Sequence, residues 1–287
     1  MPGLTMTALP AAIVKGLAHL EPLPITAQRL IDMVRGNDVA LAQVAELIEL
    51  DPVVTASVLR HASSVRLAPA GAPTVREAVL RMGAVALLDL VLEGYLAKLR
   101  VTTPVYHLNE RDLWVHGAAS KLAVRALAAA APRASIPPMA ETAALLHDVG
   151  KLLISRCLNT GVHDLATHAR TRGLTFVEAE RDLLGTDHAA VGAAMADAWR
   201  FPPEVTDAVR RHHSPPFVNA TATLDAVCVA NVVAKTIEAG SGAEGLNVAV
   251  DPLSYRRLGL DFVTFGRVCL LTDAALCEVS RAHGVAA

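Results

Sequence analysis

Short segments with helical periodicity, separated by strong helix-stop signals, constrain the fold of this chain most. Apolar residues recur at helical spacing over 41–48 and again over 53–59, and Asp51-Pro52 stands between the two segments. Proline suits the first turn of a helix and disfavours a helical residue before it, so this dipeptide ends one helix and starts the next. Short helices joined in this way fit a compact orthogonal bundle.

The residue types indicate the same fold class. Hydrophobic residues make up 53% of the chain but aromatic residues only 3%, because Ala, Leu and Val dominate. Ala and Leu are strong helix formers, whereas the aromatic residues and Ile that favour strands are scarce. The capping-box pattern that opens a helix occurs at Thr74 with Glu77 and at Thr175 with Glu178. We therefore expect an all-α protein.

Charge and hydropathy exclude several classes of function. The net charge is −2 at pH 7, so no strongly basic surface is expected to attract nucleic acid phosphates. Asp89 and Glu93 interrupt the longest apolar run, and residues 1–20 do not show the pattern of a signal peptide. The four Cys residues form no CxxC pair and lie in apolar helical patterns, which is typical of buried free thiols in a reducing cytosol. We expect a cytoplasmic protein that binds neither nucleic acid nor membrane.

The segment 101–108 is the best candidate for an internal boundary, because it combines a β-branched run with Pro104. The helical part before it has no cluster of chemically reactive residues, so protein contact is its expected role. His-rich helical segments follow it, and a last apolar helix is expected over 261–283. That helix is apolar enough to pack internally or to form a homodimer interface, and the sequence leaves both open.

The stretch Leu145 to Lys151, Leu-Leu-His-Asp-Val-Gly-Lys, places a His-Asp pair in the middle of an apolar segment that is expected to be helical. In a chain with 11 His residues, such a pair alone is weak evidence for a site. Neutral His is, however, the commonest ligand for transition metals, and the carboxylate of Asp148 can bridge two ions. Lys151 lies four residues after His147 and shares its neighbourhood on a helix; alternatively it is a solvated charge.

Further candidate ligands lie on or beside other helices. Asp112 and His116 are four residues apart and therefore share a helix face; alternatively Asp112 is a helix cap and His116 a half-buried helix residue. His188 falls in the first turn of a helix, where the helix dipole disfavours the imidazolium and favours the neutral, metal-binding form. His212 and His213 end a helix, where they are either ligands or exposed capping residues.

The order of these residues resembles that of a known superfamily. His116, His147-Asp148, His188, His212-His213 and Asn231 resemble the HD superfamily of metal-dependent phosphohydrolases, and 145–151 matches its LLHDxGK segment. The N-terminal half is similar to the HDOD domain, an HD-related bacterial output domain that is regarded as a signalling or regulatory module. The segments that carry this second likeness are 20–24, 48–52, 75–83, 186–192 and 199–202.

The resemblance implies a fold and a division of the chain. An HDOD protein is expected to be an orthogonal helical bundle, here with the HDOD domain over 17–215. Within it, 17–103 would be a helical subdomain and 104–215 the HD-like subdomain. Residues 216–287 would be a C-terminal helical extension that completes the HD-like core. The sequence shows no receiver, cyclase or DNA-binding domain, so unidentified signalling proteins are expected as partners in trans.

The resemblance also implies a set of metal ligands. His116, His147 and Asp148 match the ligands of the first metal in related HD enzymes, with Asp148 as the bridge between two ions. The ligands of the second metal in the binuclear HD-GYP branch match three further histidines, His188, His212 and His213. Asp112 falls where that branch has a glutamate, and Lys151 matches a lysine that faces the substrate phosphate or bound water.

Two departures from the HD pattern limit these implications. The last ligand of HD enzymes is an aspartate in a late helix, and Asn231 aligns with it. An amide keeps a neutral oxygen donor without the negative charge, so at least one metal ion should bind more weakly. His213 is followed by Ser-Pro-Pro-Phe instead of a Gly-Tyr-Pro signature, so recognition of cyclic di-GMP in the HD-GYP manner is not expected.

Three functions remain open on the sequence. The first is a regulatory protein that acts through protein contacts and holds one or two divalent metal ions. The second is a metal-dependent phosphohydrolase of phosphomonoesters, nucleotides or cyclic nucleotides, with Asp148 and Lys151 as catalytic groups. The third is a scaffold whose histidine cluster is filled by water. A nitrogen-rich ligand set indicates Fe, Mn, Zn or Ni rather than Mg or Ca. Asn231 favours the first function over the second, and the full histidine set favours the first over the third, because buried polar groups without partners are costly.

Overall fold

The computed structural model describes residues 9–20, 22–36, 39–64, 74–98, 104–109, 111–131, 134–157, 165–214, 219–242, 244 and 251–282. Every regular element in these ranges is a helix and none is a strand, which confirms the all-α class predicted from composition. No helix of this described part is long and apolar enough to cross a membrane. Cys228 is a buried free thiol and Cys269 and Cys277 are half-buried free thiols, while the side chain of Cys157 lies outside the described part.

The chain folds into two compact units. One comprises Pro22–Leu99 and Trp199–Pro202, and the other comprises Met1–Glu21, Arg100–Ala198 and Pro203–Ala287. The main division, between residues 99 and 100, lies next to the 101–108 segment of the expected boundary. All candidate metal ligands belong to the second unit, so the geometry of the site is set within one compact body.

The Pro22–Leu99 unit is built around one long helical element, which is kinked at Gly83, where φ is 73°. This element is α5 (Val75–Leu96). It packs against three other helices of the unit, α2 (Ile25–Arg35), α3 (Leu41–Glu49) and α4 (Pro52–Ser64). The predicted capping box opens α5, because the Thr74 hydroxyl accepts from the Glu77 N–H at 3.2 Å and the Glu77 carboxylate accepts from the Thr74 N–H at 2.8 Å. The predicted helix break at Asp51-Pro52 is also confirmed, since α3 ends just before it and α4 begins at the proline.

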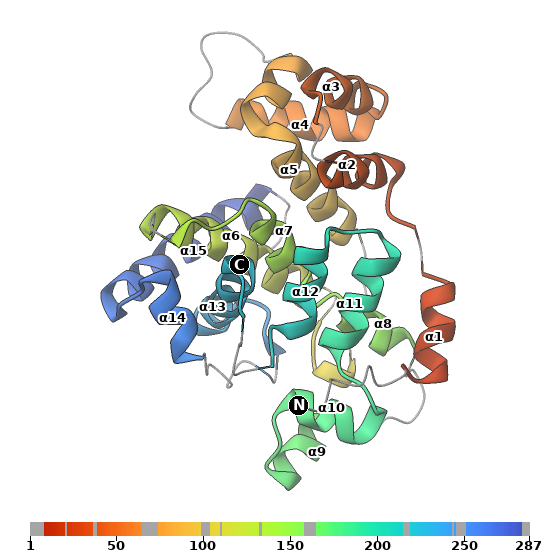
Figure 1. Ribbon diagram of the computed structural model, residues 1–287, viewed down its shortest axis with the longest axis vertical. Helices are drawn as coiled ribbons and strands as arrows, with labels where there is room; N and C mark the ends of the chain where they lie inside the picture. Colours follow the sequence, from red (N-terminus) through yellow and green to blue (C-terminus); the bar gives the residue numbers. More distant parts are fainter. Residues whose placement is uncertain are drawn as a thin grey trace. The chain divides into compact units, whose positions relative to one another are not determined.

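Three mutually packed helices form the centre of the other unit: α6 (Asp112–Ala130), α7 (Met139–Leu146) and α13 (Ala222–Thr236). The apolar helix α13 is buried along nearly its whole length. Around this centre lie α8 (Gly150–Cys157), α11 (His188–Ala198) and α12 (Pro203–Arg211) (Figure 1). α11 packs against α8 and α12, and α12 packs against α7 and α13. Helices far apart in the sequence therefore meet around one point.

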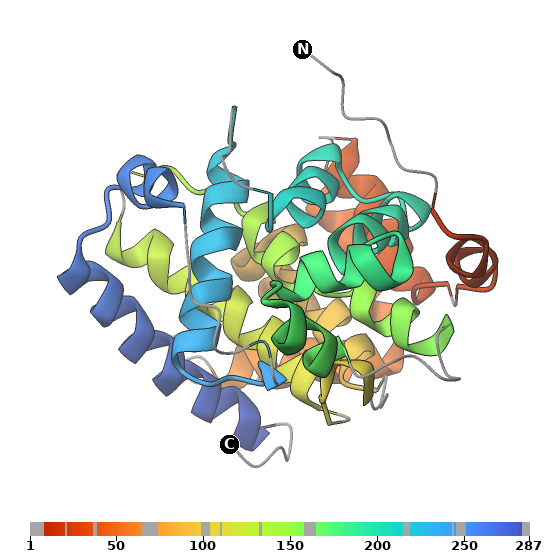
Figure 2. The ribbon, with the colours of Figure 1, turned by 90° about the horizontal axis from the view of Figure 1, so that it is seen from below.

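Shorter elements complete this unit. They are α1 (Ala11–Ala18), η1 (Pro104–Tyr106), α9 (Leu165–Arg172), α10 (Phe176–Leu184) and α14 (Pro252–Leu258). α10 packs against α9 and is opened by the predicted Thr175–Glu178 capping box. The expected C-terminal helix is confirmed as α15 (Phe262–Ala282), dark blue in Figure 2, which packs against α6 and α13.

Candidate metal centre

The His147-Asp148 pair lies in a tight turn between α7 and α8, so the expectation that it stands inside a helix is wrong. α7 ends at Leu146, and α8 begins at Gly150. The Nδ1 atom of His147 hydrogen-bonds to the Ala144 carbonyl at 2.7 Å, and the Val149 N–H donates to the Leu146 carbonyl at 2.9 Å. The backbone bond closes the turn, and the side-chain bond fixes the orientation of the His147 ring.

Gly150 explains how this turn reaches α11. A Cβ atom at this position would overlap the carbonyl oxygen of His188 and would lie 2.6 Å from the Gly192 nitrogen. Only a residue without a side chain allows the backbones of α8 and α11 to approach this closely. The approach brings Asp148, two residues before the glycine, against His188 at the start of α11.

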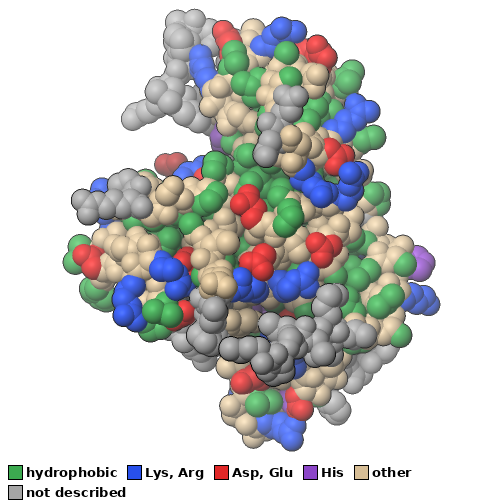
Figure 3. Space-filling view, viewed as in Figure 1, with side chains coloured by type: hydrophobic (Ala, Val, Ile, Leu, Met, Phe, Trp, Pro, Cys, Tyr) green, Lys and Arg blue, Asp and Glu red, His purple; other side chains and the backbone are tan. Residues whose placement is uncertain are grey.

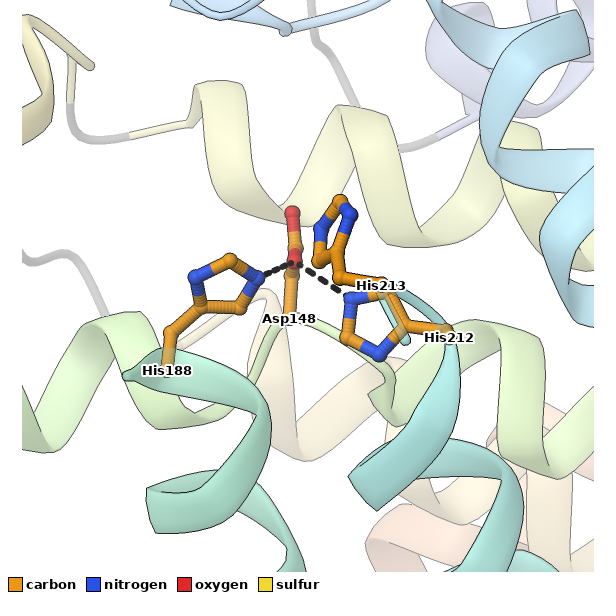
Figure 4. A group of neighbouring side chains, drawn as sticks. All are labelled: Asp148, His188, His212 and His213. Atoms are coloured by element: carbon orange, nitrogen blue, oxygen red, sulfur yellow. Dashed lines mark ion pairs between the residues drawn. The ribbon is translucent and has the colours of Figure 1, made fainter. Parts of the chain in front are cut away.

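Asp148 joins two groups of candidate ligands. One group consists of His116, His147 and Asp148, and the other of Asp148, His188, His212 and His213. Within each group the candidate ligand atoms all lie within 4.8 Å of one another. Figure 4 shows the second group, in which the imidazoles come from the start of α11 and the end of α12 and face the Asp148 carboxylate. This placement brings together the five histidines and Asp148 that the HD likeness selected, but not Asp112.

The two oxygens of Asp148 face different groups. Oδ2 lies 3.6 Å from the Nε2 atoms of both His116 and His147, whereas Oδ1 lies 3.2 Å from Nε2 of His188 and 3.6 Å from Nε2 of His212. Ligands held about 2.1 Å from one ion are themselves about 3.0–3.4 Å apart. The separations therefore match donor atoms arranged around ions, and the divided carboxylate is placed to bridge two of them.

Hydrogen bonds at Nδ1 fix which nitrogen of each imidazole faces the centre. Nδ1 lies 2.7 Å from the Ala144 carbonyl in His147 and 2.7 Å from the Val209 carbonyl in His212. In His116 it lies 3.0 Å from the Ala239 carbonyl. A carbonyl only accepts, so Nδ1 carries the proton and Nε2 of the neutral ring presents a lone pair. This is the arrangement of metal-binding histidines.

Several of these donor atoms are buried without a hydrogen-bond partner. They are the Nε2 atoms of His147, His188, His212 and His213 together with Oδ1 of Asp148. Although His188 Nε2 is only 3.2 Å from Asp148 Oδ1, the two are not aligned as a hydrogen bond. Leaving buried polar atoms unsatisfied is costly, and a cation would satisfy all of them at once. The residues therefore fit a bound transition metal.

The charge state of the centre also suits a cation. Burial lowers the pKa of His116, His147 and His212, even though the Asp148 carboxylate acts in the opposite direction, so these rings are neutral at pH 7. Burial alone would raise the pKa of Asp148, but the ammonium of Lys151 holds it well below its usual range. The neutral imidazoles of His116, His147 and His212 thus face an ionised carboxylate.

His188 differs from the other histidines because a buried carboxylate supports it. Burial would lower its pKa, but Glu180 outweighs this effect and raises the pKa to about 10. Both oxygens of Glu180 lie within 2.9 Å of Nδ1 of His188, and Oε1 also accepts from the Tyr106 hydroxyl at 2.6 Å. A carboxylate behind a histidine ligand is a common way to orient the ring and raise its basicity. The neutral form expected for His188 at the start of a helix is therefore wrong without a bound cation, because Glu180 outweighs the helix dipole and keeps the ring protonated at pH 7. A metal ion would bind His188 by displacing the proton on Nε2.

Of the three remaining candidate residues, Asn231 and Lys151 lie at the cluster and Asp112 does not. Asp112 accepts from the backbone N–H and side-chain amide of Asn109, at 2.7 and 3.0 Å, and lies outside both ligand groups. Asn231 is at the centre, with Oδ1 3.2 Å from Nε2 of His116. Lys151 donates to Oδ2 of Asp148 at 2.7 Å. Asp112 is thus held by Asn109, just before α6, while Asn231 and Lys151 adjoin the cluster.

Sequence patterns overlooked two buried carboxylates beside the cluster, Glu180 and Glu244. Glu180 carried a usable signal, since it follows Val177 by three residues and so lies on the apolar side of α10. Glu244 carried none, because it lies in the glycine-rich segment 240–245, whose composition is typical of a loop. Its two oxygens accept from Lys151 at 2.5 Å and from Lys235 at 2.9 Å.

The fold and the centre together define a helical protein of the HD type. The family model of the HDOD domain matches residues 20–215. This match covers more than half of the chain, and the chain belongs to the HDOD domain family.

Solved structures share this fold. An HDOD domain protein with unknown function from Geobacter sulfurreducens is 24% identical, with a TM-score of 0.70 over 95% of this chain and 96% of that chain. A Marinobacter aquaeolei VT8 protein whose name proposes signal transduction is 21% identical, with a TM-score of 0.64 over 95% of this chain and 64% of that chain. A Shewanella amazonensis SB2B protein whose name proposes a phosphohydrolase is 23% identical, with a TM-score of 0.59 over 91% of this chain and 98% of that chain.

A curated relative is less informative about function. It is an uncharacterized protein from Treponema pallidum (strain Nichols), 22% identical over 211 residues. The match covers 73% of this chain but only 40% of the relative, so the chain spans well under half of that protein's length.

Proposed function

We propose that this chain is a regulatory signal-transduction protein that acts through protein contacts and retains a divalent metal centre. The observation that supports the metal centre is the set of buried ligand atoms without hydrogen-bond partners that converge on Asp148. The Asn231 amide offers oxygen without charge, so the His116 side of the centre should hold its ion more weakly than the His188 side. The nitrogen-rich set favours Fe, Mn, Zn or Ni, as one or two ions.

The burial of the centre favours regulation over turnover. His116, His147, Asp148 and His188 are each at most 5% exposed, and only the His213 side chain, at 15%, is appreciably accessible. A closed centre can hold an ion that stabilises one conformation, whereas rapid catalysis needs access for substrate and release of product. The name of the Marinobacter neighbour, which proposes signal transduction, agrees with this assignment.

The Pro22–Leu99 unit offers a surface for partner proteins. Four large apolar side chains are exposed there, by 64–76%: Ile25, Leu50, Val53 and Leu80. Leu50 and Val53 flank the junction of α3 and α4, so one partner surface can cover both. Lys and Arg side chains are interspersed with Asp and Glu on the face seen in Figure 3, which fits a protein partner better than a nucleic acid. We propose signalling proteins acting in trans in the cytoplasm as these partners.

A homodimer is a further part of this proposal. On α15 the side chains of Phe262, Val263 and Leu270 are 90%, 77% and 75% exposed. A second copy would remove this apolar surface from water. Sedimentation of the purified protein tests this, since a monomer at all concentrations would contradict it.

The second candidate function is a metal-dependent phosphohydrolase, as the name of the Shewanella neighbour proposes for that protein. The observation that favours it is Lys151, whose ammonium adjoins the bridging carboxylate. Two ions in such a centre would supply Lewis-acid catalysis and activate water near neutral pH. His147, His188 and Asp148 would hold the ions, and Lys151 would bind the phosphate.

One pair of assays separates the two functions. The protein loaded with each candidate metal is incubated with phosphomonoesters, nucleotides and cyclic dinucleotides, beside a His147→Ala/Asp148→Ala variant. The regulatory proposal expects no turnover in either protein, whereas turnover that disappears in the variant would establish the phosphohydrolase. In parallel, a Leu50→Asp/Val53→Asp variant should lose capture of the partner, while the His147→Ala/Asp148→Ala variant should retain it.

A further inference from the structure

A second charged site lies directly beside the metal centre. Lys151 of α8, Lys235 in the last turn of α13 and Glu244 are each at most 5% exposed. Oε2 of Glu244 accepts from the Lys151 ammonium at 2.5 Å, and Oε1 accepts from the Lys235 ammonium at 2.9 Å. Each carboxylate oxygen is therefore held by a different cation, which makes Glu244 a bound anion rather than a free side chain.

This anion touches the metal-binding residues. Lys151 also donates to Oδ2 of Asp148 at 2.7 Å, and Nε2 of His213 lies 3.6 Å from Oε1 of Glu244. The ring of Tyr106 covers the Lys151 ammonium, with 5.5 Å between nitrogen and ring centroid. The carboxylate thus lies against two ammonium groups and an imidazole, and an aromatic ring covers one of these ammonium groups. Ammonium groups converging on one buried space are suited to an oxyanion.

The backbone that delivers Glu244 is packed tightly against the same unit. Gly240 has a φ of 58°, and a Cβ atom there would overlap the carbonyl oxygen of Asp112 at the start of α6. The preceding Ala239 carbonyl is the partner of His116 Nδ1. The chain leaving α13 is therefore fixed against α6, which places the Glu244 carboxylate between the two lysines.

We propose that Lys151 and Lys235 form a pocket for a phosphate-type oxyanion and that Glu244 occupies this pocket as an internal competitor. The proposal deepens the regulatory function above and rests on it for the role of the neighbouring metal, but the pocket itself requires no metal. A ligand that carries a phosphoryl group would bind only by displacing the carboxylate. This internal anion explains why the chain keeps the charged groups of a phosphate site in a closed centre.

The charges predict what removal of Glu244 does. Two carboxylates, Asp148 and Glu244, face two ammonium groups, Lys151 and Lys235, so the four charges cancel. Glu244→Ala leaves one buried positive charge uncompensated and opens space where the carboxylate was. Inorganic phosphate should then bind at least about tenfold more tightly than to the unaltered protein, and it should raise the midpoint of thermal unfolding of the variant. Glu244→Gln removes the charge but fills the space, so its gain should be smaller.

The test measures phosphate binding by calorimetry and thermal unfolding, with and without chelator. Glu238→Ala is the matched control, because Glu238 is an exposed carboxylate six residues away and should leave phosphate binding unchanged. A Lys235→Met/Glu244→Ala variant should lose the gained binding. Equal phosphate affinity of Glu244→Ala, Glu238→Ala and the unaltered protein would overturn the proposal.

Two further measurements keep the outcome decisive. If Glu244→Ala does not fold, Glu244→Asp retains the charge but shortens the side chain, so phosphate should stabilise it more than it stabilises the unaltered protein. Equal stabilisation would again overturn the pocket. The metal content of the same samples is measured separately, so protein without metal that gains phosphate binding would support the pocket while contradicting the metal-binding function.

Discussion

Gly150→Ala is the substitution that tests most sharply how the fold assembles the centre. The added methyl group would meet backbone atoms of α11, the His188 carbonyl oxygen and the Gly192 nitrogen, the latter at 2.6 Å. Backbone atoms cannot rotate away as a side chain can. Ordinary contact needs about 3.5 Å between heavy atoms, and the His188 oxygen is the closer of the two atoms, so α8 and α11 must separate by more than about 1 Å.

Two opposing effects set the magnitude. Replacing Gly by Ala in a helix stabilises by up to about 1 kcal/mol, and less at Gly150 because it is the first residue of α8. Forcing an extra methyl group into a packed core costs about 1–3 kcal/mol, and the upper end applies where only backbone can yield. We expect the free energy of unfolding to fall by about 2 kcal/mol. The 3.2 Å approach of Asp148 to His188 should also lengthen, which weakens metal binding.

Urea unfolding followed by circular dichroism measures the first effect, and calorimetric titration with Mn²⁺ or Zn²⁺ measures the second. The matched control is Gly266→Ala in α15, because a Cβ atom there would meet nothing within 4 Å. Gly266→Ala should leave metal affinity unchanged and stability equal or higher. A Gly150→Ala protein as stable as this control, with unchanged metal affinity, would refute the close-approach argument.

The other predictions concern charge and protonation. Asn231→Asp restores a negative oxygen beside His116, so Mn²⁺ or Zn²⁺ should bind about tenfold more tightly by calorimetry; unchanged affinity would remove Asn231 from the centre. Glu180→Gln replaces one accepting oxygen by an amide NH₂, which then faces groups that donate hydrogen bonds to the Glu180 carboxylate. The free energy of unfolding, measured in chelator, should therefore fall by about 1–3 kcal/mol. No loss of stability would mean that these hydrogen bonds are not formed. The pKa values of His147 and His213 are lowered by burial, so below about pH 6.5 the unfolded chain takes up protons that the fold does not. The stability due to these neutral rings is therefore present above pH 6.5 and lost on acidification, and urea unfolding in chelator at pH 7, 6 and 5 should show a steady decrease.

Local sequence patterns predicted the helices well because their signals are local. Capping boxes at Thr74 and Thr175 and the Asp51-Pro52 break act through neighbouring backbone groups, and the structure places helix starts at each of them. The candidate histidines could be selected from their order along the chain and the HD likeness. Their convergence was an expectation, since it depends on packing between helices that are far apart in the sequence.

Features decided by long-range contacts were not predictable. The turn at His147-Asp148 depends on the approach of α8 to α11, which apolar periodicity does not reveal. Glu244 stands in a segment with the composition of a loop, and only the two buried lysines make its position meaningful. Asp112 shows the opposite case, because its hydrogen bonds to Asn109 are local and hold it away from the ligand role that the HD-GYP likeness implied.

The central claim, that the histidines and Asp148 hold a metal, is tested most directly by elemental analysis of the purified protein. The unaltered chain and a His168→Ala control, whose histidine pairs with Asp182 outside the centre, should each contain at least one transition-metal ion per chain. The His147→Ala/Asp148→Ala variant should contain much less. Protein without stoichiometric metal, or a double variant that keeps its metal, would contradict the account.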